Sequence, residues 1–272
     1  MKLEQLSGAG NHFLLLDARS ELELPGGAPL DGDVAREWCV AAAREGALEP
    51  DGVLVLTESE TAAARLEIWN ADGSLAAACG NGLRCAGWHL LRESGLAEVV
   101  IETQTGTHKV SGETSEDGAE HLEAALGPVK VEKLQSSFAL LEGERAAWRG
   151  DVGNLHCVFL VEDVHSPHFE GRGRALQADS TFPGGVNVGY LAEEAGSWRL
   201  RVFERGVGET GACGTGAAAA AAVLRETFKL SFPLNIELPA GRLTIAEAAD
   251  GGLSVTGGVE HRGPLLLGAQ ST

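Results

Sequence analysis

Two cysteines in this sequence stand where a glycine-rich loop leads into an expected helix. Cys213 lies in Gly-Ala-Cys-Gly-Thr-Gly, directly before an alanine-rich run, and Cys79 lies in Cys-Gly-Asn-Gly. The positive end of a helix lowers the pKa of a thiol, so thiolate is available there near neutral pH. The unpaired N–H groups of the first helical turn also hold small anions. The two thiols are therefore candidates for proton transfer beside a bound carboxylate.

The surroundings of the two cysteines repeat along the chain. Asn70 precedes Cys79 by nine positions, and Glu204 precedes Cys213 by nine. A hairpin glycine and an earlier Gly-Asn pair recur in the same order in both halves: Gly106 and Gly241, and Asn11 and Asn154. Repeated anchors at similar spacing indicate an internal duplication, although glycine-rich turns can also align by chance. A twofold fold is expected to face the two cysteine loops toward each other across one cleft.

Two facing thiols suit the inversion of a stereocentre. One cysteine, as a thiolate, removes the proton from a carbon, and the other, as a thiol, delivers a proton to the opposite face. If the carbon is the α-carbon of an amino acid, negative charge builds on its carboxylate, and two helix N-termini stabilise this enolate-like transition state. The two thiols share one proton and titrate as a coupled pair.

Short strands and three helices must position these loops. In the first half we expect strands at residues 3–6, 13–17, 53–57, 66–69, 98–103 and 107–111, helices at 33–46 and 80–94, and an exposed acidic loop at 113–120. In the second half we expect strands at residues 154–161, 186–191, 198–202, 234–238, 243–246 and 253–256, and a helix at 215–227. Asp33 is the expected N-cap of the first helix, and Gly95 the expected end of the second. Many short antiparallel strands around one long helix per half, without a strand–helix–strand rhythm, predict the α+β class.

Composition narrows the classes of function. The 272 residues are 44% hydrophobic, which is typical of a globular protein, and carry a formal net charge of −18. Such an acidic chain disfavours nucleic-acid binding, which needs Lys and Arg against phosphate. No apolar leader follows Met1, and the longest apolar run, residues 217–224, is too short to span a bilayer. We therefore expect a cytoplasmic protein that neither binds nucleic acid nor enters a membrane.

The cysteine pattern argues against disulfides and metal. The chain has five cysteines, an odd number, and no Cys-x-x-Cys, so neither a disulfide framework nor a zinc site is expected. Cys39 and Cys157 lie in apolar surroundings, and Cys85 follows on the helix after Cys79. We expect these three to act as small packing residues.

Several motifs in fixed order carry a resemblance to a known family. They are Gly8-x-Gly-Asn-x-Phe13, Asn70-Ala-Asp-Gly-Ser74, Cys79-Gly-Asn-Gly-x-Arg84, Gly153-Asn-x-His156, Val186-Asn187, and Glu204-Arg-Gly-x-Gly-Glu-Thr-x-Ala-Cys-Gly-Thr-Gly216. Over nearly its whole length the sequence resembles diaminopimelate epimerase. The resemblance implies an isomerase that interconverts LL- and meso-2,6-diaminoheptanedioate, for lysine and peptidoglycan synthesis, without pyridoxal phosphate or another cofactor.

The resemblance also implies a fold. It consists of two pseudo-symmetric domains, each an antiparallel β-barrel-like sheet wrapped around a central helix. We expect the division to fall between residues 1–126, with Cys79, and residues 127–272, with Cys213. The last strand of the chain is expected to be able to pack back onto the first domain. A homodimer is a further expectation.

Single residues take roles from the same resemblance. Cys79 and Cys213 would be the acid/base pair, and His156 and Glu204 would tune and orient the thiols. The other residues would bind the amino-acid substrate: Gly80, Asn81, Gly214 and Thr215 at the reacting carboxylate, and Asn11, Asn70, Asn154, Asn187, Glu204 and Arg205 at the rest of the molecule. These residue types suit the task, because Arg pairs with a carboxylate as a fork and Asn both donates and accepts.

Two residues depart from the family pattern, which usually has Asp where this chain has His12 and Pro where it has Leu155. Both adjoin substrate-binding asparagines, so a related two-cysteine racemase of another amino acid stays open. From other classes, a hydrolase or acyltransferase needs one cysteine with a base such as His156, and leaves Cys79 unexplained. A non-catalytic amino-acid-binding protein needs neither thiol. The glycine-rich loops lack the Gly-Lys-Ser/Thr ending of a nucleotide-binding P-loop.

Overall fold

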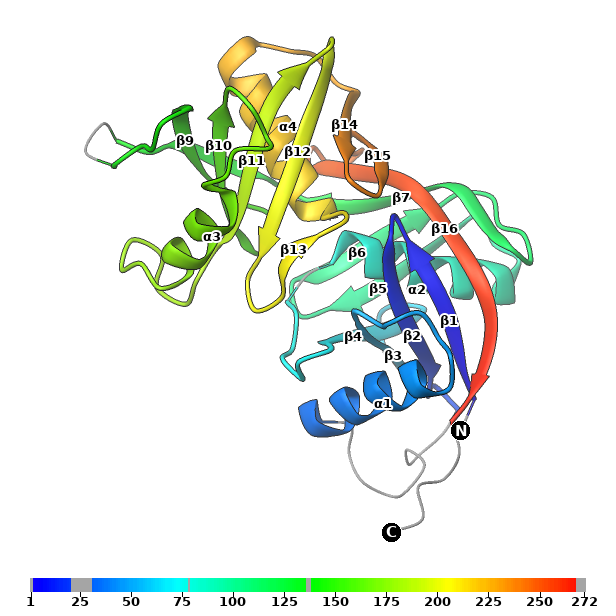
Figure 1. Ribbon diagram of the computed structural model, residues 1–272. Helices are drawn as coiled ribbons and strands as arrows, with labels where there is room; N and C mark the ends of the chain where they lie inside the picture. The colour runs from blue at the N-terminus through cyan, green and yellow to red at the C-terminus, as the bar shows by residue number, and fades with distance from the viewer. Residues whose placement is uncertain (1, 21–30, 78, 136–137, 268–272) are drawn as a thin grey trace. The chain divides into compact units, whose positions relative to one another are not determined.

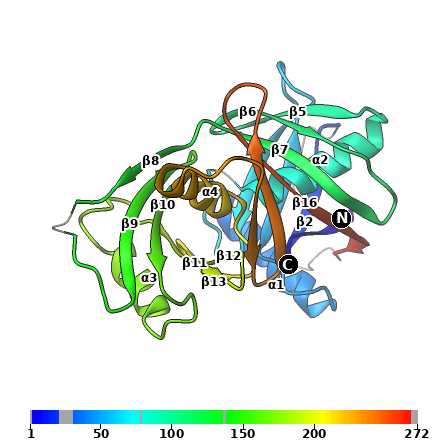
Figure 2. The ribbon, with the colours of Figure 1, turned by 90° about the horizontal axis from the view of Figure 1, so that it is seen from above.

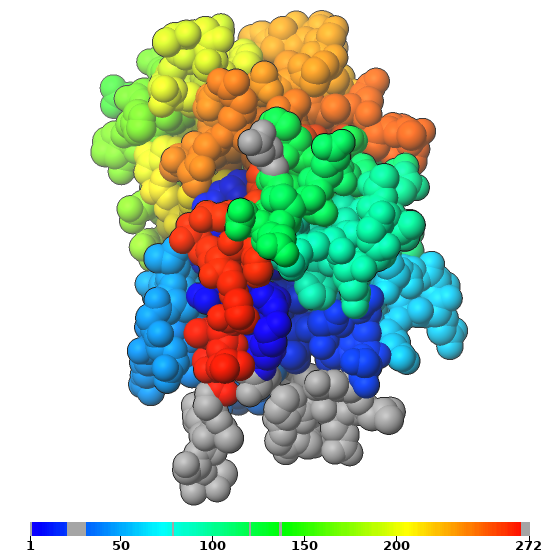
Figure 3. All heavy atoms as spheres, turned by 90° about the vertical axis from the view of Figure 1, so that its right-hand side faces the viewer, coloured from blue at the N-terminus to red at the C-terminus, as the bar shows by residue number. Residues whose placement is uncertain are grey.

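A helix surrounded by strands forms the centre of each half of the chain (Figure 1). The computed structural model describes residues 2–20, 31–77, 79–135 and 138–267. Two units are present: one is Met1–Ala124 with Gly257–Thr272, and the other is Ala125–Thr256. The last strand of the chain therefore ends in the first unit, where it pairs antiparallel with the first strand (Figure 3).

The first unit is a closed eight-stranded barrel. Its strands are β1 (Lys2–Gly8), β2 (Asn11–Asp17), β3 (Gly52–Thr57), β4 (Ala64–Asn70), β5 (Glu98–Thr103), β6 (Gly106–Ser111), β7 (Gly118–Gly127) and β16 (Leu253–Leu266). They pair in this order, and β16 pairs with β1 to close the ring. Helix α2 (Gly80–Ser94) contacts β1 to β6, and α1 (Gly32–Arg44) packs against β3 and β4.

The second unit repeats the arrangement of strands around a central helix. Its strands are β8 (Lys130–Lys133), β9 (Glu144–Asp151), β10 (Leu155–Val161), β11 (Asn187–Glu194), β12 (Ser197–Glu204), β13 (Gly208–Thr210), β14 (Leu234–Leu238), β15 (Gly241–Glu247) and the start of β16. Helix α4 (Gly214–Phe228) contacts β8 to β12, β14 and β15, and Figure 2 shows it enclosed by these strands. Helix α3 (Phe169–Gln177) packs against β11, β12 and β13.

The order of connections confirms the predicted duplication and the α+β class. In the first unit β2 and β3 are parallel and joined through α1, and β4 and β5 are parallel and joined through α2. In the second unit β10 and β11 are joined through α3, and β12 and β14 through α4, again as parallel pairs. The expectation that strand–helix–strand units are missing was therefore wrong, and the barrel-like sheets are mixed. Parallel neighbours need a crossover, and each helix supplies one.

Burial on both faces explains the most apolar strands. Leu14 and Leu16 of β2 and Val53 and Val55 of β3 pack with Cys39 of α1 in one cluster. Their neighbours along each strand face the other side, toward α2, so both strands read as continuous apolar runs. Strand β5, in contrast, alternates exposed and buried residues, because one of its faces meets solvent.

The central helices begin and end as their sequences predict. Helix α2 ends at Gly95, which adopts the left-handed conformation with φ 67°. The alanines at the start of α4 are all buried, so strands lie close against this helix. A Cβ added to Gly150 of β9 would come within 3.0 Å of the Ala219 Cβ. Small residues on both sides therefore permit the close contact.

Several local expectations need correction. The N-cap of α1 is Asp31 rather than Asp33, because Asp31 Oδ1 accepts from the backbone N–H groups of Asp33 and Val34 at 3.0 Å. The acidic loop expected at 113–120 is shorter, since β7 begins at Gly118. The sequence interpretation did not include α3, β7, β8, β9 or β13.

Candidate active site

Both candidate cysteines are N-caps of central helices with matching backbone geometry. Cys79 has φ −150° and ψ 107°, and Cys213 has φ −132° and ψ 108°. The Cys79 sulfur accepts from the Gly82 N–H at 3.3 Å, and the Cys213 sulfur from the Gly216 N–H at 3.4 Å. Each thiol thus lies at the positive end of a fifteen-residue helix, where a thiolate is stabilised.

The glycine in each first turn has a steric reason. A Cβ at Gly82 would lie 3.0 Å from the Leu54 Cδ2 and 3.5 Å from the Cys79 sulfur. A Cβ at Gly216 would lie 3.0 Å from a Val202 methyl group and 3.3 Å from the Cys213 sulfur. Glycine therefore lets the helix start approach the barrel wall while the sulfur caps the turn.

The first turns are also suited to holding an anion. Neither helix has an acidic residue in its first turn. Gly80 and Asn81 lead into α2, and Gly214 and Thr215 lead into α4, with backbone N–H groups at the helix N-terminus. These four residues are the ones expected to hold the reacting carboxylate, and such ends bind carboxylates readily.

In the first unit two amides meet beside Cys79. Asn81, which is 1% exposed, donates its Nδ2 to Asn11 Oδ1 at 2.7 Å and accepts at Oδ1 from an Arg84 Nη at 2.8 Å. Asn70 ends β4, and its Nδ2 donates to Ser74 Oγ at 2.9 Å. The Asn70 side chain thus bonds within its own turn.

The second unit has an equivalent contact between Asn154 and Thr215. Thr215 Oγ1 accepts from Asn154 Nδ2 at 3.2 Å and lies 3.0 Å from His156 Nε2 and 3.5 Å from the Cys213 sulfur. Asn154 Oδ1 lies 3.1 Å from His156 Nε2. Because the amide oxygen of Asn154 can only accept, Nε2 of His156 carries the ring proton. Thr215 Oγ1 accepts from Asn154 and His156, so its own hydrogen can point to the Cys213 sulfur.

His156 is neutral in the folded protein. Burial lowers the pKa of its imidazole to about 3, and the side chain is 1% exposed. Its Nδ1 has no hydrogen-bond partner in the part of the chain that the structure describes. The neutral imidazole of His156 is therefore linked to the Cys213 sulfur through the Thr215 hydroxyl.

This burial has a consequence for stability in mild acid. Between about pH 3 and about pH 6.5 the unfolded chain binds a proton at His156 and the native protein does not, so acid favours unfolding. From about pH 7 to about pH 5 this residue alone is expected to remove about 2 kcal/mol from the free energy of unfolding. Denaturant unfolding at both pH values should show a smaller loss for His156→Gln. An equal loss in the wild-type protein and the variant would contradict the assignment.

Asn187 and Arg205 lie together at one end of the second unit. Asn187 donates its Nδ2 to the Leu155 carbonyl at 3.0 Å and accepts at Oδ1 from the Arg205 backbone N–H at 2.9 Å. The exposed Arg205 guanidinium donates one Nη to the Gly184 carbonyl at 2.9 Å. The guanidinium has further N–H donors of the kind that bind a carboxylate.

Glu204 is held by a neighbouring hydroxyl. Its Oε1 accepts from Thr210 Oγ1 at 2.6 Å, and its backbone carbonyl accepts from Gln177 Nε2 at 3.0 Å. The carboxylate therefore has a fixed place at the end of β12, nine residues before Cys213.

The predicted site residues thus fall into two groups, one in each unit. The first unit holds Asn11, Asn70, Cys79, Gly80 and Asn81, and the second holds Asn154, His156, Asn187, Glu204, Arg205, Cys213, Gly214 and Thr215. Within each group the first turn after the capping cysteine bonds to an asparagine: Asn11 of β2 in the first unit, and Asn154 of the turn between β9 and β10 in the second.

The other cysteines are packing residues, as expected. All five cysteines are free thiols. Burial raises the pKa of Cys39 to about 11 and the pKa values of Cys85 and Cys157 to about 12. These three remain protonated at neutral pH and are poor nucleophiles and bases.

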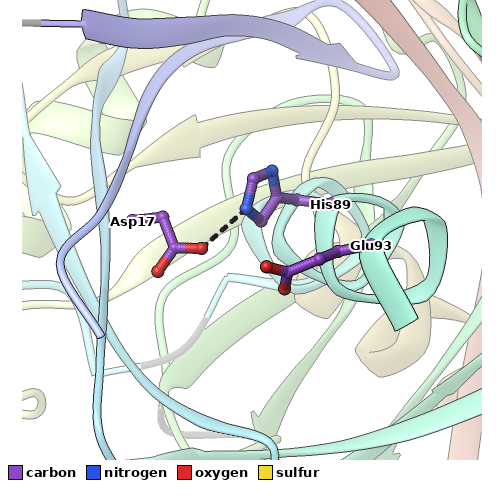
Figure 4. A group of neighbouring side chains, drawn as sticks. All are labelled: Asp17, His89 and Glu93. Carbon is purple, nitrogen blue, oxygen red and sulfur yellow. Dashed lines mark hydrogen bonds and ion pairs between the residues drawn. The ribbon is translucent and has the colours of Figure 1, made fainter. Parts of the chain in front are cut away.

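An acidic cluster with a histidine lies on the same unit as Cys79. His89 Nε2 and Asp17 Oδ2 are 2.8 Å apart, and Figure 4 shows the two side chains pointing toward each other, with Glu93 one turn further along α2. Such a group can ligate a metal. Here Arg19 donates to the carboxylates of both Asp17 and Glu93, and this pairing lowers the pKa of Asp17 against the effect of its burial. Arg19 therefore already supplies the positive charge of this cluster, and the contact between His89 and Asp17 connects α2 to β2.

The sequence interpretation gave no role to Arg84, a buried cation of α2. Arg84 is 0% exposed, and from sequence alone it is one more member of the Cys79 motif. Its position on α2, where most neighbouring residues are small or apolar, is the sequence signal that could have indicated its burial.

No helix in the described part of the chain combines the length and the apolar character needed to cross a membrane.

Comparison with known proteins agrees with these features. The sequence model of diaminopimelate epimerase matches residues 6–131 and 150–262. The diaminopimelate epimerase of Moorella thermoacetica is 36% identical, covering 90% of this chain and 91% of the relative. That of Xanthomonas axonopodis pv. citri is also 36% identical, covering 92% of this chain and 90% of the relative.

Solved structures share the fold at low sequence identity. A predicted epimerase from Pseudomonas aeruginosa has a TM-score of 0.73 at 18% identity, covering 98% of this chain and 99% of that chain. A probable proline racemase from Agrobacterium radiobacter K84 has a TM-score of 0.70 at 17% identity, covering 99% of this chain and 93% of that chain. These likenesses show the fold alone.

Proposed function

Because the chain belongs to the diaminopimelate epimerase family, we propose that it converts LL-2,6-diaminoheptanedioate to the meso form, as a step in lysine and peptidoglycan synthesis. The observation that carries the proposal is the repeated N-cap: each unit places one cysteine, in the same geometry, at the start of its central helix. The proposed reaction needs one of these two thiols on each face of the substrate's α-carbon.

The reaction needs two proton-transfer groups and no cofactor. The thiolate of one cysteine takes the α-proton, and the electron pair of the broken C–H bond moves into the carboxylate. The thiol of the other cysteine then protonates the carbon from the opposite face, so the configuration inverts. The first turns of α2 and α4 hold the carboxylate, whose charge grows in the transition state.

The distal end of the substrate accounts for the remaining polar residues. The guanidinium of Arg205 would bind the second carboxylate, and Asn187 fixes the backbone of Arg205. Glu204 carries a negative charge suited to an ammonium group, and Asn11, Asn70 and Asn154 add amide donors and acceptors. A substrate with a carboxylate and an amine at both ends uses all of these groups.

The local structure also bears on the alternatives. A cysteine hydrolase with His156 as base is disfavoured, because the imidazole bonds to Asn154 and Thr215 and burial lowers its pKa to about 3. Leu155 packs against the apolar cluster of the second unit, so this departure from the family pattern is accommodated as packing. The backbone N–H of His12 donates to the Asp51 carboxylate at 2.7 Å.

Two further parts of the proposal come from the sequence alone. We expect the enzyme to work in the cytoplasm, where amino-acid biosynthesis takes place, and to form a homodimer.

A panel of single stereoisomers tests the substrate. Purified protein should epimerise LL-2,6-diaminoheptanedioate with a kcat/KM at least about 10³-fold higher than its kcat/KM for lysine, glutamate or proline. These three amino acids lack the second carboxylate, the second amine or both, so charged groups of the site would stay unpaired. Chiral chromatography of each reaction gives the rates, and Cys213→Ala protein prepared in parallel excludes contaminating activity. Equal or faster turnover of a shorter amino acid would overturn the substrate and identify His12 and Leu155 as changes in specificity.

A further inference from the structure

Asp51 lies between the two segments of the first unit that carry Asn11 and Asn70. Its carboxylate Oδ2 accepts from the backbone N–H of His12 at 2.7 Å, and its own N–H donates to the His12 carbonyl at 2.7 Å. Its carbonyl accepts from the backbone N–H of Ala71 at 2.9 Å. His12 directly follows Asn11, and Ala71 directly follows Asn70. One residue therefore binds the backbone beside two of the expected substrate-binding asparagines.

The order of the strands explains this position. Strand β3 lies between β2, its parallel neighbour, and β4, its antiparallel neighbour. Strands β2 and β3 therefore begin, and β4 ends, at the same end of the barrel. Asn11 is the first residue of β2, Asn70 is the last residue of β4, and Asp51 directly precedes β3. All three residues thus lie at this end of the barrel.

The start of β3 is held closely against β4. Gly52, the first residue of β3, pairs with Asn70, and a Cβ added to Gly52 would lie 2.2 Å from the Trp69 carbonyl oxygen. Only glycine permits such a close approach of two backbones. The position of Asp51 relative to the Asn70 segment is therefore closely defined.

The bond from His12 to the carboxylate is the part that depends on the Asp51 side chain. It uses the His12 N–H, which lies just before the first residue pair of β2 and β3, Phe13 and Gly52. A carboxylate makes a stronger bond to a backbone N–H than a neutral acceptor does. Because the bond uses the backbone of His12, it does not depend on the side chain at position 12, where the sequence departs from the family pattern.

Both asparagine side chains depend on the placement of their backbones. Asn11 is 8% exposed, and its Oδ1 accepts from Asn81 Nδ2, in the first turn of α2, at 2.7 Å. The Asn70 carbonyl accepts from the Gly73 N–H at 2.9 Å, and its Nδ2 donates to Ser74 Oγ at 2.9 Å. A shift of either backbone therefore moves an amide that is expected to bind the substrate.

We propose that Asp51 is a positioning residue for substrate binding in the first unit, because its carboxylate and its peptide group hold the Asn11 and Asn70 segments together. The inference rests on the proposed epimerase for the identity of the substrate. In the described part of the chain the hydrogen bonds of Asp51 go to backbone groups and not to Cys79. Loss of its carboxylate should therefore weaken binding more than it slows the chemical step.

Amide hydrogen exchange of the substrate-free protein tests the anchor. In Asp51→Ala, NMR should show the His12 amide exchanging at least about 10-fold faster than in the wild-type protein, and the Ala71 amide should also exchange faster. Amides of the β5–β6 hairpin, in the same unit, should keep their rates. Unchanged exchange at His12 or at Ala71, or an equal rise throughout the unit, would overturn the proposal. No substrate is used, so a wrong epimerase assignment does not affect this result.

Steady-state kinetics with LL-2,6-diaminoheptanedioate test the effect on binding. Asp51→Ala should raise KM about 10-fold and change kcat by less than about twofold, because it weakens contacts made equally in the ground state and the transition state. Asp51→Asn keeps an acceptor oxygen without the charge, so its KM should be intermediate. Glu49→Ala removes an exposed acid two residues earlier in the chain and is the matched control, which should keep both constants.

An unchanged KM in Asp51→Ala, or a fall in kcat as large as the expected rise in KM, would reject the positioning role. If Asp51→Ala does not fold, Asp51→Asn decides by the same measurements: faster exchange at His12 with a raised KM supports the role, and wild-type values reject it. If the wild-type protein does not turn over 2,6-diaminoheptanedioate, the proposed function fails, and the exchange rates alone decide whether Asp51 holds the two segments.

Discussion

Cys79→Ala and Cys213→Ala are each expected to lower kcat for 2,6-diaminoheptanedioate by about 10³-fold or more, in both reaction directions. Each change removes one of the two groups that move a proton. His156 cannot take over the role of Cys213, because its imidazole is bonded to Asn154 and Thr215 and burial lowers its pKa to about 3. Steady-state rates from each stereoisomer, measured by chiral chromatography, give the effect.

The matched controls are Cys39→Ala and Cys157→Ala. Both thiols are buried and free, and burial raises their pKa values to about 11 and about 12. These variants should keep the wild-type rate and show only a change in thermal stability. A full rate in either Cys79→Ala or Cys213→Ala would remove that thiol from the mechanism. A rate loss in the controls as large as that in the site variants would show that the assay reports folding instead of chemistry.

Local signals in the sequence were enough to predict where the two central helices begin. The Cys-Gly start and the final Gly95 fix both ends of α2, because an N-cap and a left-handed glycine are determined by a few adjacent residues. The spacing of Asn70 and Glu204 before the two cysteines reflects a duplication that the strand order confirms. Resemblance to the family added the residue roles.

Long-range pairing could not be predicted from the same signals. The parallel pairs β2–β3 and β10–β11 join strands far apart in sequence, and each strand alone reads the same in a parallel or an antiparallel sheet. Helix α3 was missed because its residues include two glycines and no side chain caps its start. These features are fixed by packing against the barrel and not by local propensity.

The electrostatics of the site also depend on tertiary structure. The neutral state of His156 follows from its burial beside Thr215, a residue that belongs to another element of the second unit. Arg84 could be read as a surface charge until its burial on α2 is known. Burial and hydrogen-bond partners, more than residue identity, determine which of these groups carries a charge.

The two-base mechanism predicts a particular pattern of isotope uptake. A proton taken by one sulfur cannot readily return to the same face of the carbon, because the other sulfur delivers its own proton first. Both thiols exchange with solvent between turnovers, so the delivered isotope comes from water. A single-base enzyme would instead reprotonate either face from one group.

The reaction of pure LL-2,6-diaminoheptanedioate in deuterium oxide, stopped within the first few per cent of conversion, measures this directly. Mass spectrometry after chiral separation should find deuterium at the inverted α-carbon of nearly every product molecule and almost none in the recovered substrate. Comparable early deuterium in recovered substrate and product, or product that retains the original proton, would contradict separate donor and acceptor cysteines, even if both Cys79→Ala and Cys213→Ala are inactive.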